Sequence, residues 1–214
     1  MLDIRVLFKE FDEHLLKDEQ PSVYFKKLLA TGIYFKQYPF TMLGELVKIQ
    51  QQPDHHPEGN VWNHTMLVVD NAALRRHLSE DARAFMWAAL LHDLGKAPTT
   101  KLRKGKITSY DHDKIGEKLS LEFISALTDD TELIKRVPKL VRWHMQTLFV
   151  VKDLPFADIH AMLKEVSLNE IAMLSTCDRL GRGAMTQEKV QKELENIRIF
   201  IDKCSAYNIE HLRR

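Results

Sequence analysis

The sequence predicts an all-α protein that carries one small peripheral β-hairpin. Its 214 residues are 44% hydrophobic and 29% charged, with only eight glycines and seven prolines, a composition typical of a globular domain. Apolar residues recur at helical spacing through most of the chain. The only strand pattern is TTKL and KITSY on either side of Arg103-Lys104-Gly105, within about 99–110. These three observations favour helices over many short strands.

Charge and cysteine content exclude several classes of protein. Lys plus Arg number 31 and Asp plus Glu 30, so no global field favours an anionic membrane or a nucleic acid backbone. Cys177 and Cys204 are too few for a disulfide scaffold. The N-terminus lacks the apolar core of a signal peptide and any spanning segment. We therefore expect a cytoplasmic protein with no membrane partner.

The first elements are an amphipathic helical stretch and a polar loop. A helix up to about Leu29 breaks near Pro21, where Ser22 is placed to cap its second part, and Gly32 stops it. A short helix is expected over 38–47. The run QQQPDHHPEGN at 50–60 is rich in residues that favour loops.

The central elements bring the first histidines. Residues 61–78 have helical periodicity, with His64 in the first turn. Asp81 is placed to cap a helix over 82–95 that is apolar nearly all round and should be buried. Gly95 is placed to end that helix, and the hairpin follows it.

The remaining segments continue the helical pattern. Helices are expected at 112–127, 130–145, 157–166, 168–182 and 186–206, and Pro138 must kink a helix or begin a new one. We expect a helical extension at 1–50, a central domain at 51–185 and a covering helix at 186–214, packed as one compact unit.

The doublet His92-Asp93 lies at the end of the most apolar helix. A buried carboxylate without a partner costs several kcal/mol, roughly, so Asp93 needs a cation. An isolated doublet favours a capped helix end with a satisfied core histidine. Further candidate ligands lie in other helical segments: His64, His112, His144 and Asp178. Ligands that converge from several helices are normal for a metal site in a helical bundle.

Several short sequence segments resemble those of a known family. HPEGNVWNHTMLVVDNAA, ALLHDLGKAPTT, GKITSYDHDKIGEKLS, VRWHM and CDRLGR are similar in order to the C-terminal HD domain of bacterial tRNA nucleotidyltransferases. The likeness runs from about Pro21 to Arg182, and the chain resembles the HD superfamily of metal-dependent phosphohydrolases. The nucleotidyltransferase head has no counterpart, since no Gly-Ser dipeptide occurs. We expect a stand-alone HD domain that does not itself add nucleotides.

The resemblance implies an HD-domain helical bundle with one or two divalent transition metal ions. The residues that match the ligands of the first ion are His64, His92, Asp93 and Asp178. His112 and His144 match the ligands of the second, and Asp93 would bridge both ions. Imidazole and carboxylate ligands without thiolate suit Fe, Mn, Co, Ni or Zn.

Such a site predicts phosphate chemistry, because paired ions lower the pKa of a bound water and clamp phosphoryl oxygens. Asp93 and Lys96 are the candidate catalytic residues. Lys96 either binds the phosphate, as the HDxGK word suggests, or is a cation favoured at a helix C-terminus. Arg179 and Arg182 either contact the phosphate or form surface salt bridges.

Two polar clusters are open to more than one interpretation. His55, His56 and Glu58 either line the entrance of the site or belong to a polar loop, the interpretation that their composition favours. The hairpin cations either steer an RNA end or nucleotide to the site or are a solvated turn; they are Lys101, Arg103, Lys104 and Lys106.

Three functions are compatible with the sequence. The first is hydrolysis of a phosphomonoester or a 2′,3′-cyclic phosphodiester on a nucleotide or an RNA 3′ end. The second is the reaction of a di-iron oxygenase, which the HD superfamily also contains. The third is a non-catalytic module that holds tRNA or docks on a separate nucleotidyltransferase. The sequence leaves the metal, the substrate and the oligomeric state open.

Overall fold

The computed structural model describes residues 3–212 and is all-helical except for one hairpin, as predicted. The α-helices are α1 (Ile4–Lys17), α2 (Ser22–Ala30), α3 (Thr41–Leu46), α4 (Val61–Ala73), α5 (Ala82–Leu91), α6 (Lys96–Thr99), α7 (His112–Ser125), α8 (Thr131–Trp143), α9 (Gln146–Val151), α10 (Ile159–Glu165), α11 (Leu168–Leu180) and α12 (Gln187–Leu212). Short 3₁₀ turns cover Ile33–Phe35 and Arg76–Leu78. The strands are β1 (Lys101–Arg103) and β2 (Lys106–Thr108).

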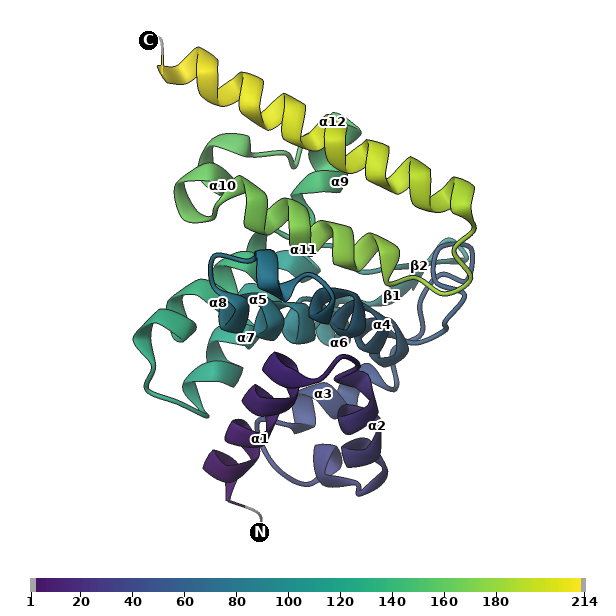
Figure 1. Cartoon of the computed structure of the whole chain (residues 1–214). Coiled ribbons are helices and arrows are strands. Elements are labelled where there is room, and N and C mark those ends of the chain that lie inside the picture. Colours follow the sequence, from purple (N-terminus) through teal and green to yellow (C-terminus); the bar gives the residue numbers. More distant parts are fainter. Residues whose placement is uncertain (1–2, 213–214) are drawn as a thin grey trace.

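Helix α5 is the centre of the bundle. Every residue from 84 to 91 is buried, which agrees with its nearly continuous apolar sequence. Helices α1, α4, α8 and α11 all pack against it. In Figure 1, α1 to α3 lie at one end of the molecule, and α12 lies at the opposite end beyond α11. The prediction that the 82–95 segment is buried is confirmed, although its regular helix is shorter.

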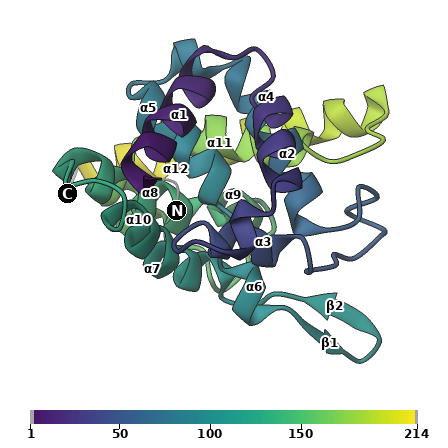
Figure 2. The same cartoon turned by 90° about the horizontal axis from the view of Figure 1, so that it is seen from below.

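The hairpin is peripheral, as expected. Strands β1 and β2 pair antiparallel, with Lys101 opposite Thr108 and Arg103 opposite Lys106. Figure 2 shows the hairpin projecting away from the helices next to α6. Its exposed residues include Leu102, which is 75% accessible.

Two local expectations are wrong in detail, and a third is narrowed. The 61–78 segment is helical only to Ala73, and a 3₁₀ turn completes it. Ser22 does not cap α2; its N–H instead donates to Asp70 Oδ1 over 3.0 Å, which joins α2 to α4. Pro138 lies inside α8, so of the two alternatives expected for it the structure excludes the start of a new helix.

Gly95 has a different role from the one expected. Its φ of −64° is right-handed, so it is not a left-handed helix stop. A Cβ at this position would lie 1.9 Å from the carbonyl oxygen of His112 and 2.7 Å from the amide nitrogen of Gly116. Gly95 therefore lets the turn after α5 touch the backbone of α7, which begins at His112.

A polar contact holds α1 on α5. The carboxylate of Asp12 accepts hydrogen bonds from Arg83 Nε and Nη2, and from Trp87 Nε1 over 2.6 Å. Around it, Phe8 and Phe11 stack on the Trp87 ring, with centroids 5.3 and 5.9 Å away. The first helix is thus fastened to the central helix by both polar and apolar contacts.

Replacing Asp12 by Ala is expected to lower the free energy of unfolding by about 2 kcal/mol, because Trp87 Nε1 and two of the Arg83 donors lose their acceptor. Arg83 Nη1 keeps its hydrogen bond to Asp130. Chemical denaturation of wild type and Asp12→Ala measures this. Glu13→Ala is the matched control, since Glu13 is 61% exposed and, among the described residues, pairs only with Lys17. Equal stability of the two variants would show that the Asp12 contact does not fasten α1.

Candidate metal centre

Helix ends deliver the candidate ligands to one place. Asn60 caps α4 by accepting from the amide of Asn63, which sets His64 in the first turn. The other four sites also lie at or near helix ends: His92-Asp93 after α5, His112 at the start of α7, His144 after α8, and Asp178 in the last turn of α11. Five segments that are distant in sequence thus meet at one centre.

The carboxylate of Asp93 lies between two groups of imidazoles. Its Oδ2 is 3.3 Å from His92 Nε2 and 3.9 Å from His64 Nε2. Its Oδ1 is 3.5 Å from His112 Nε2 and 3.9 Å from His144 Nε2. Of the three groups of possible metal ligands among the described residues, two contain Asp93: His64–His92–Asp93 and Asp93–His112–His144. The third group is His56–Glu58–His64.

Three of these histidines are oriented in the same way. The Nδ1–H of His92 donates to the carbonyl of Ala89, that of His112 to Ser109, and that of His144 to Val141. A carbonyl only accepts, so Nδ1 carries the proton and Nε2 presents its lone pair to Asp93. Metal-binding histidines are oriented by such hydrogen bonds.

The resulting arrangement could hold a metal ion. His112 Nε2 and His144 Nε2 lie 3.2 Å apart, and neither carries a proton in this tautomer. Among the described residues, His92 Nε2 is buried without a hydrogen-bond partner. His92, Asp93 and His144 are at most 2% exposed, so bulk water does not satisfy these atoms. The donor set fits divalent transition metal ions.

The pKa values support the same protonation states. Burial alone would raise the pKa of Asp93, but the Lys96 charge and the neighbouring imidazoles hold it well below its usual range. Burial and the nearby His112 and His92 lower the pKa of His144 to about 3. The centre at neutral pH therefore contains a carboxylate and a neutral His144 imidazole, the forms that bind metals.

Asp178 reaches the centre through His64. Its Oδ1 lies 2.9 Å from His64 Nε2. Burial would raise the pKa of Asp178, but the His64 hydrogen bond and the Arg182 charge help to hold it well below its usual range. The structure thus brings Asp178 to the His64 side, whereas His112 and His144 lie on the other side of Asp93.

Lys96 lies at the same centre. Its Nζ is 2.7 Å from Asp93 Oδ2 and donates to Gln51 Oε1 over 2.7 Å. The side chain is 13% exposed, so the ammonium group is held in place rather than solvated. The turn at Gly95 puts Lys96 at the start of α6, next to Asp93.

Arg179 and Arg182 both pair with a residue of α12. Arg179 Nη1 pairs with Glu193 of α12 over 2.8 Å, and Arg182 Nη1 lies 3.5 Å from the same carboxylate. Arg179 is buried in this pair. The structure therefore holds both guanidinium groups to α12 by Glu193 and does not place Arg179 in the metal clusters.

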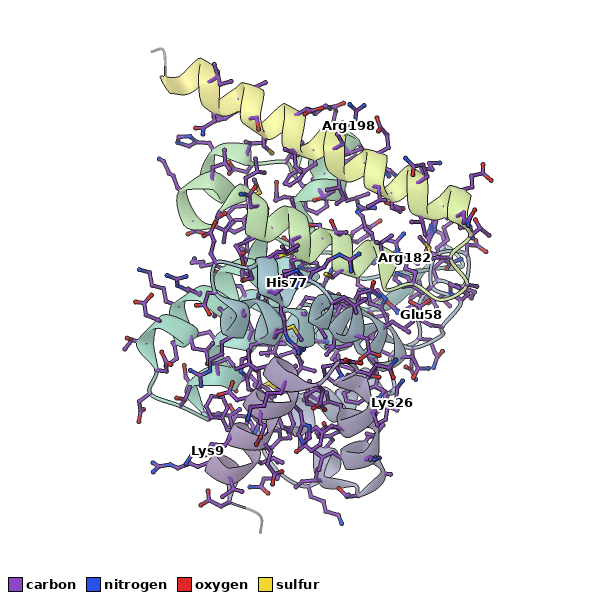
Figure 3. The ribbon with its side chains drawn as sticks, in the orientation of Figure 1. Lys9, Lys26, Glu58, His77, Arg182 and Arg198 are labelled. Carbon is purple, nitrogen blue, oxygen red and sulfur yellow. The ribbon has the colours of Figure 1, made fainter. Side chains whose placement is uncertain are left out.

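Glu58 is the functional candidate that sequence reasoning underrated. Its Oε1 accepts from His64 Nδ1 over 3.0 Å and from His56 Nδ1 over 2.8 Å, and its Oε2 accepts from the amide of Gly183 over 2.9 Å. Burial would raise the pKa of Glu58, but these hydrogen bonds hold it below its usual range. Figure 3 shows Glu58 close to Arg182, where the 50–60 loop meets the end of α11. Glu58 therefore orients His64 and ties together the two segments that carry His64 and Asp178.

Replacing Glu58 by Gln is expected to weaken metal binding by about 10- to 100-fold, as for other residues that orient metal-binding histidines. The amide accepts at one oxygen only, so the hydrogen bonds to His64 and Gly183 cannot both persist. Competition with a chromophoric chelator measures the affinity. Glu45→Gln is the control, because Glu45 is exposed and its one ion pair within the described part of the chain is with Lys48. Wild-type affinity in Glu58→Gln would contradict the orienting role.

The bundle is all-helical, and it brings four buried histidines and two aspartates together at helix ends. These features place the protein in the class of candidate His/Asp metal proteins. The HD domain family model matches residues 61–183, a span that contains every candidate ligand. The chain belongs to the HD domain family, whose members form a superfamily of metal-dependent hydrolases.

Its curated relatives are multifunctional CCA proteins. The chain is 32% identical to that of Hahella chejuensis over 167 residues, which are 78% of this chain and 35% of the relative. It is 36% identical to the protein of Actinobacillus pleuropneumoniae serotype 5b over 83 residues, 39% of this chain and 20% of the relative. It is 36% identical to the protein of Pasteurella multocida over 105 residues, which are 49% of this chain and 24% of the relative. The similarity thus spans about a third or less of these relatives.

Within residues 3–212, no helix has both the length and the apolar character that crossing a membrane requires.

Proposed function

We propose that this protein is a metal-dependent phosphohydrolase that acts on phosphomonoester or 2′,3′-cyclic phosphodiester groups of nucleotides or RNA 3′ ends. The observation that carries the proposal is the Asp93 carboxylate, whose two oxygens each face a different pair of imidazole Nε2 atoms. A carboxylate shared by two clusters is the expected bridge of a two-metal site, which suits phosphate ester hydrolysis.

One or two divalent transition ions, of Fe, Mn, Ni, Co or Zn, would be held by the candidate ligands His64, His92, Asp93, Asp178, His112 and His144. Bound there, such ions supply Lewis-acid stabilisation of phosphoryl oxygens and acidify a coordinated water. His64, His92 and Asp178 serve the first cluster, and His112 and His144 serve the second.

The chain itself supplies charge and orientation. The low pKa of Asp93 keeps it an anion, and its burial keeps its position fixed. The Lys96 ammonium, held by Gln51 and Asp93, provides a preorganised cation for a substrate phosphate. Arg179 and Arg182 stay a weaker proposal for phosphate contact, because they reach a substrate only when their pairs with Glu193 open.

The substrate class is supported by the relatives. Multifunctional CCA proteins match 39% and 78% of this chain, which agrees with the resemblance to the HD domain of tRNA nucleotidyltransferases. A nucleotide or RNA 3′-end phosphate is therefore the proposed substrate, and tRNA a proposed partner. The division into 1–50, 51–185 and 186–214 and the cytoplasmic location stay predictions.

Metal analysis combined with a substrate panel tests the proposal. Purified protein should contain stoichiometric transition metal and hydrolyse nucleoside 2′-, 3′- or 2′,3′-cyclic phosphates, and chelation should abolish turnover. A metal-loaded protein that turns over none of these would contradict it. Turnover that requires dioxygen would identify an oxygenase instead, and tRNA binding without turnover would identify a non-catalytic module.

A further inference from the structure

The hairpin carries an unusual local excess of positive charge. Between Lys96 and Tyr110 the sequence has no acidic residue, and four cations lie on the hairpin: Lys101, Arg103, Lys104 and Lys106. All four are exposed. In the part of the chain that the structure describes, none of the four takes part in an ion pair. In a chain of net charge +1, this is a local site for anions and not a consequence of overall charge.

The strand register divides the hairpin into two faces. Side chains of cross-strand partners lie on the same face, and neighbours along a strand alternate. Lys101, Arg103, Lys106 and Thr108 therefore share one face, while Leu102 and Ile107 share the other. The N–H of Ile107 donates to Gln52 Oε1 over 3.3 Å, which attaches the edge of β2 to the 50–60 loop. The cations thus line the face opposite Leu102 and Ile107.

An exposed aromatic ring completes this face. The guanidinium of Arg103 lies over the ring of Tyr110, 4.6 Å from its centroid, and Tyr110 is 62% exposed. Aromatic rings beside cations are the usual platform for the bases of a single strand. Alternate strand residues are about 7 Å apart, a spacing similar to that of successive phosphates in an extended strand.

The hairpin is fixed to the metal centre at both ends. It begins just after α6, whose first residue is Lys96, and it leads into α7, whose first residue is His112. The hydroxyl groups of Thr100 and Ser109 share a hydrogen bond of 2.7 Å at its base. The backbone carbonyl of Ser109 also accepts a hydrogen bond from His112 Nδ1 over 2.7 Å. A ligand on the cationic face is therefore held next to the elements that carry the site.

We propose that this face, formed by Lys101, Arg103, Lys106 and Tyr110, binds a single-stranded RNA segment and presents its 3′ end to the metal centre. The inference deepens the proposed function and rests on it for the fate of the 3′ end. The cationic face favours an RNA end over a free nucleotide as the substrate. Several cations along a strand bind successive phosphates, and a mononucleotide has no such series. Ring stacking favours single-stranded RNA over a duplex, whose bases are already stacked.

Fluorescence anisotropy tests the surface directly. The probe is a single-stranded RNA of about 12 nucleotides with a 3′ phosphate, added to the full chain in chelator so that no turnover occurs. In the variant Lys101→Gln/Arg103→Gln/Lys106→Gln, Kd should rise about tenfold or more, and the slope of log affinity against log salt should fall by about 2. Tyr110→Ala should weaken binding roughly 5- to 100-fold, and Tyr110→Phe should restore it.

The control variant is Lys9→Gln/Lys26→Gln/Lys27→Gln, which removes the same charge from exposed positions on α1 and α2. Figure 3 shows Lys9 and Lys26 at the N-terminal end of the molecule. This variant should keep the wild-type salt slope. Equal slopes for the hairpin variant and wild type, or no RNA binding by wild type at low salt, would overturn the proposal.

Hydrolysis of a nucleoside 3′-monophosphate separates this inference from the proposed function. The hairpin variant should keep wild-type turnover of the mononucleotide and lose turnover of the RNA at low substrate concentration. An equal loss on both substrates would overturn the hairpin proposal. RNA binding that depends on the hairpin, in a protein that hydrolyses no phosphate ester, would support the surface while contradicting the proposed function.

Discussion

Replacing Asp93 by Asn should abolish metal binding and hydrolysis. The amide keeps the shape of the carboxylate but loses its charge and one of the two acceptors that face the imidazole pairs. Replacing a residue that only orients a metal ligand lowers the metal affinity by about 10- to 100-fold. Replacing a ligand that both clusters share should therefore lower it by more than about 100-fold. Elemental analysis and turnover of the phosphate panel measure the two losses.

Thermal unfolding gives a readout independent of activity. A ligand at about 100 times its Kd stabilises the folded state by about 2.7 kcal/mol, so added metal should raise the Tm of wild type but not of Asp93→Asn. Asp111→Asn is the matched control, because Asp111 is exposed, precedes His112 and has a φ of 58° that Asn tolerates. A metal-induced Tm rise in Asp93→Asn equal to that of wild type would exclude Asp93 as the bridge.

Replacing Gly95 by Ala should destabilise the whole bundle. The added Cβ would lie 1.9 Å from the carbonyl oxygen of His112, which is backbone and cannot rotate away. Overpacking of this severity costs about 3 kcal/mol or more, which corresponds to a fall in Tm of roughly 6–12 °C for a chain of this size. Separation of α7 from the α5 turn would also displace His112 from Asp93, so metal content should fall.

The control variant Gly105→Ala distinguishes the effect of steric crowding at Gly95 from the effect of backbone conformation at a glycine. Gly105 has a φ of 75°, but no atom lies within 4 Å of its missing Cβ. Alanine there should cost only about 1–2 kcal/mol and leave metal content unchanged. If Gly95→Ala were no less stable than Gly105→Ala, the close approach of the α5 turn to α7 would not hold in solution.

The local sequence was sufficient for the longer helices and the hairpin, but it did not predict the short helices α6 and α9. The apolar run in 82–95 predicted a buried central helix, and α5 is that helix. Asp81 was predicted to cap it, and its side chain accepts from the amide of Ala84. Such signals act within one or two turns, so they can be interpreted without knowledge of the fold. The ends of helices were less predictable, as the early end of α5 at Leu91 shows.

Gly95 and Ser22 show why these details failed. A glycine after a helix is a good stop signal by local criteria, but the right-handed φ of Gly95 serves a contact with residues 112 and 116. Ser22 is likewise a good cap by type, but it bonds to Asp70, which is distant in sequence. In both cases a tertiary contact decided the conformation, and no local pattern reports such a contact.

The sequence by itself determined the class of this protein: a helical bundle in which His92-Asp93 and four further residues are candidate metal ligands. Only the tertiary structure decided how they are arranged, with Asp93 between two imidazole pairs and Glu58 holding His64. The physical reason is that helix periodicity depends on neighbours in the chain. The distance between two helix ends depends instead on how the helices pack, and here that packing includes the glycine contact at Gly95.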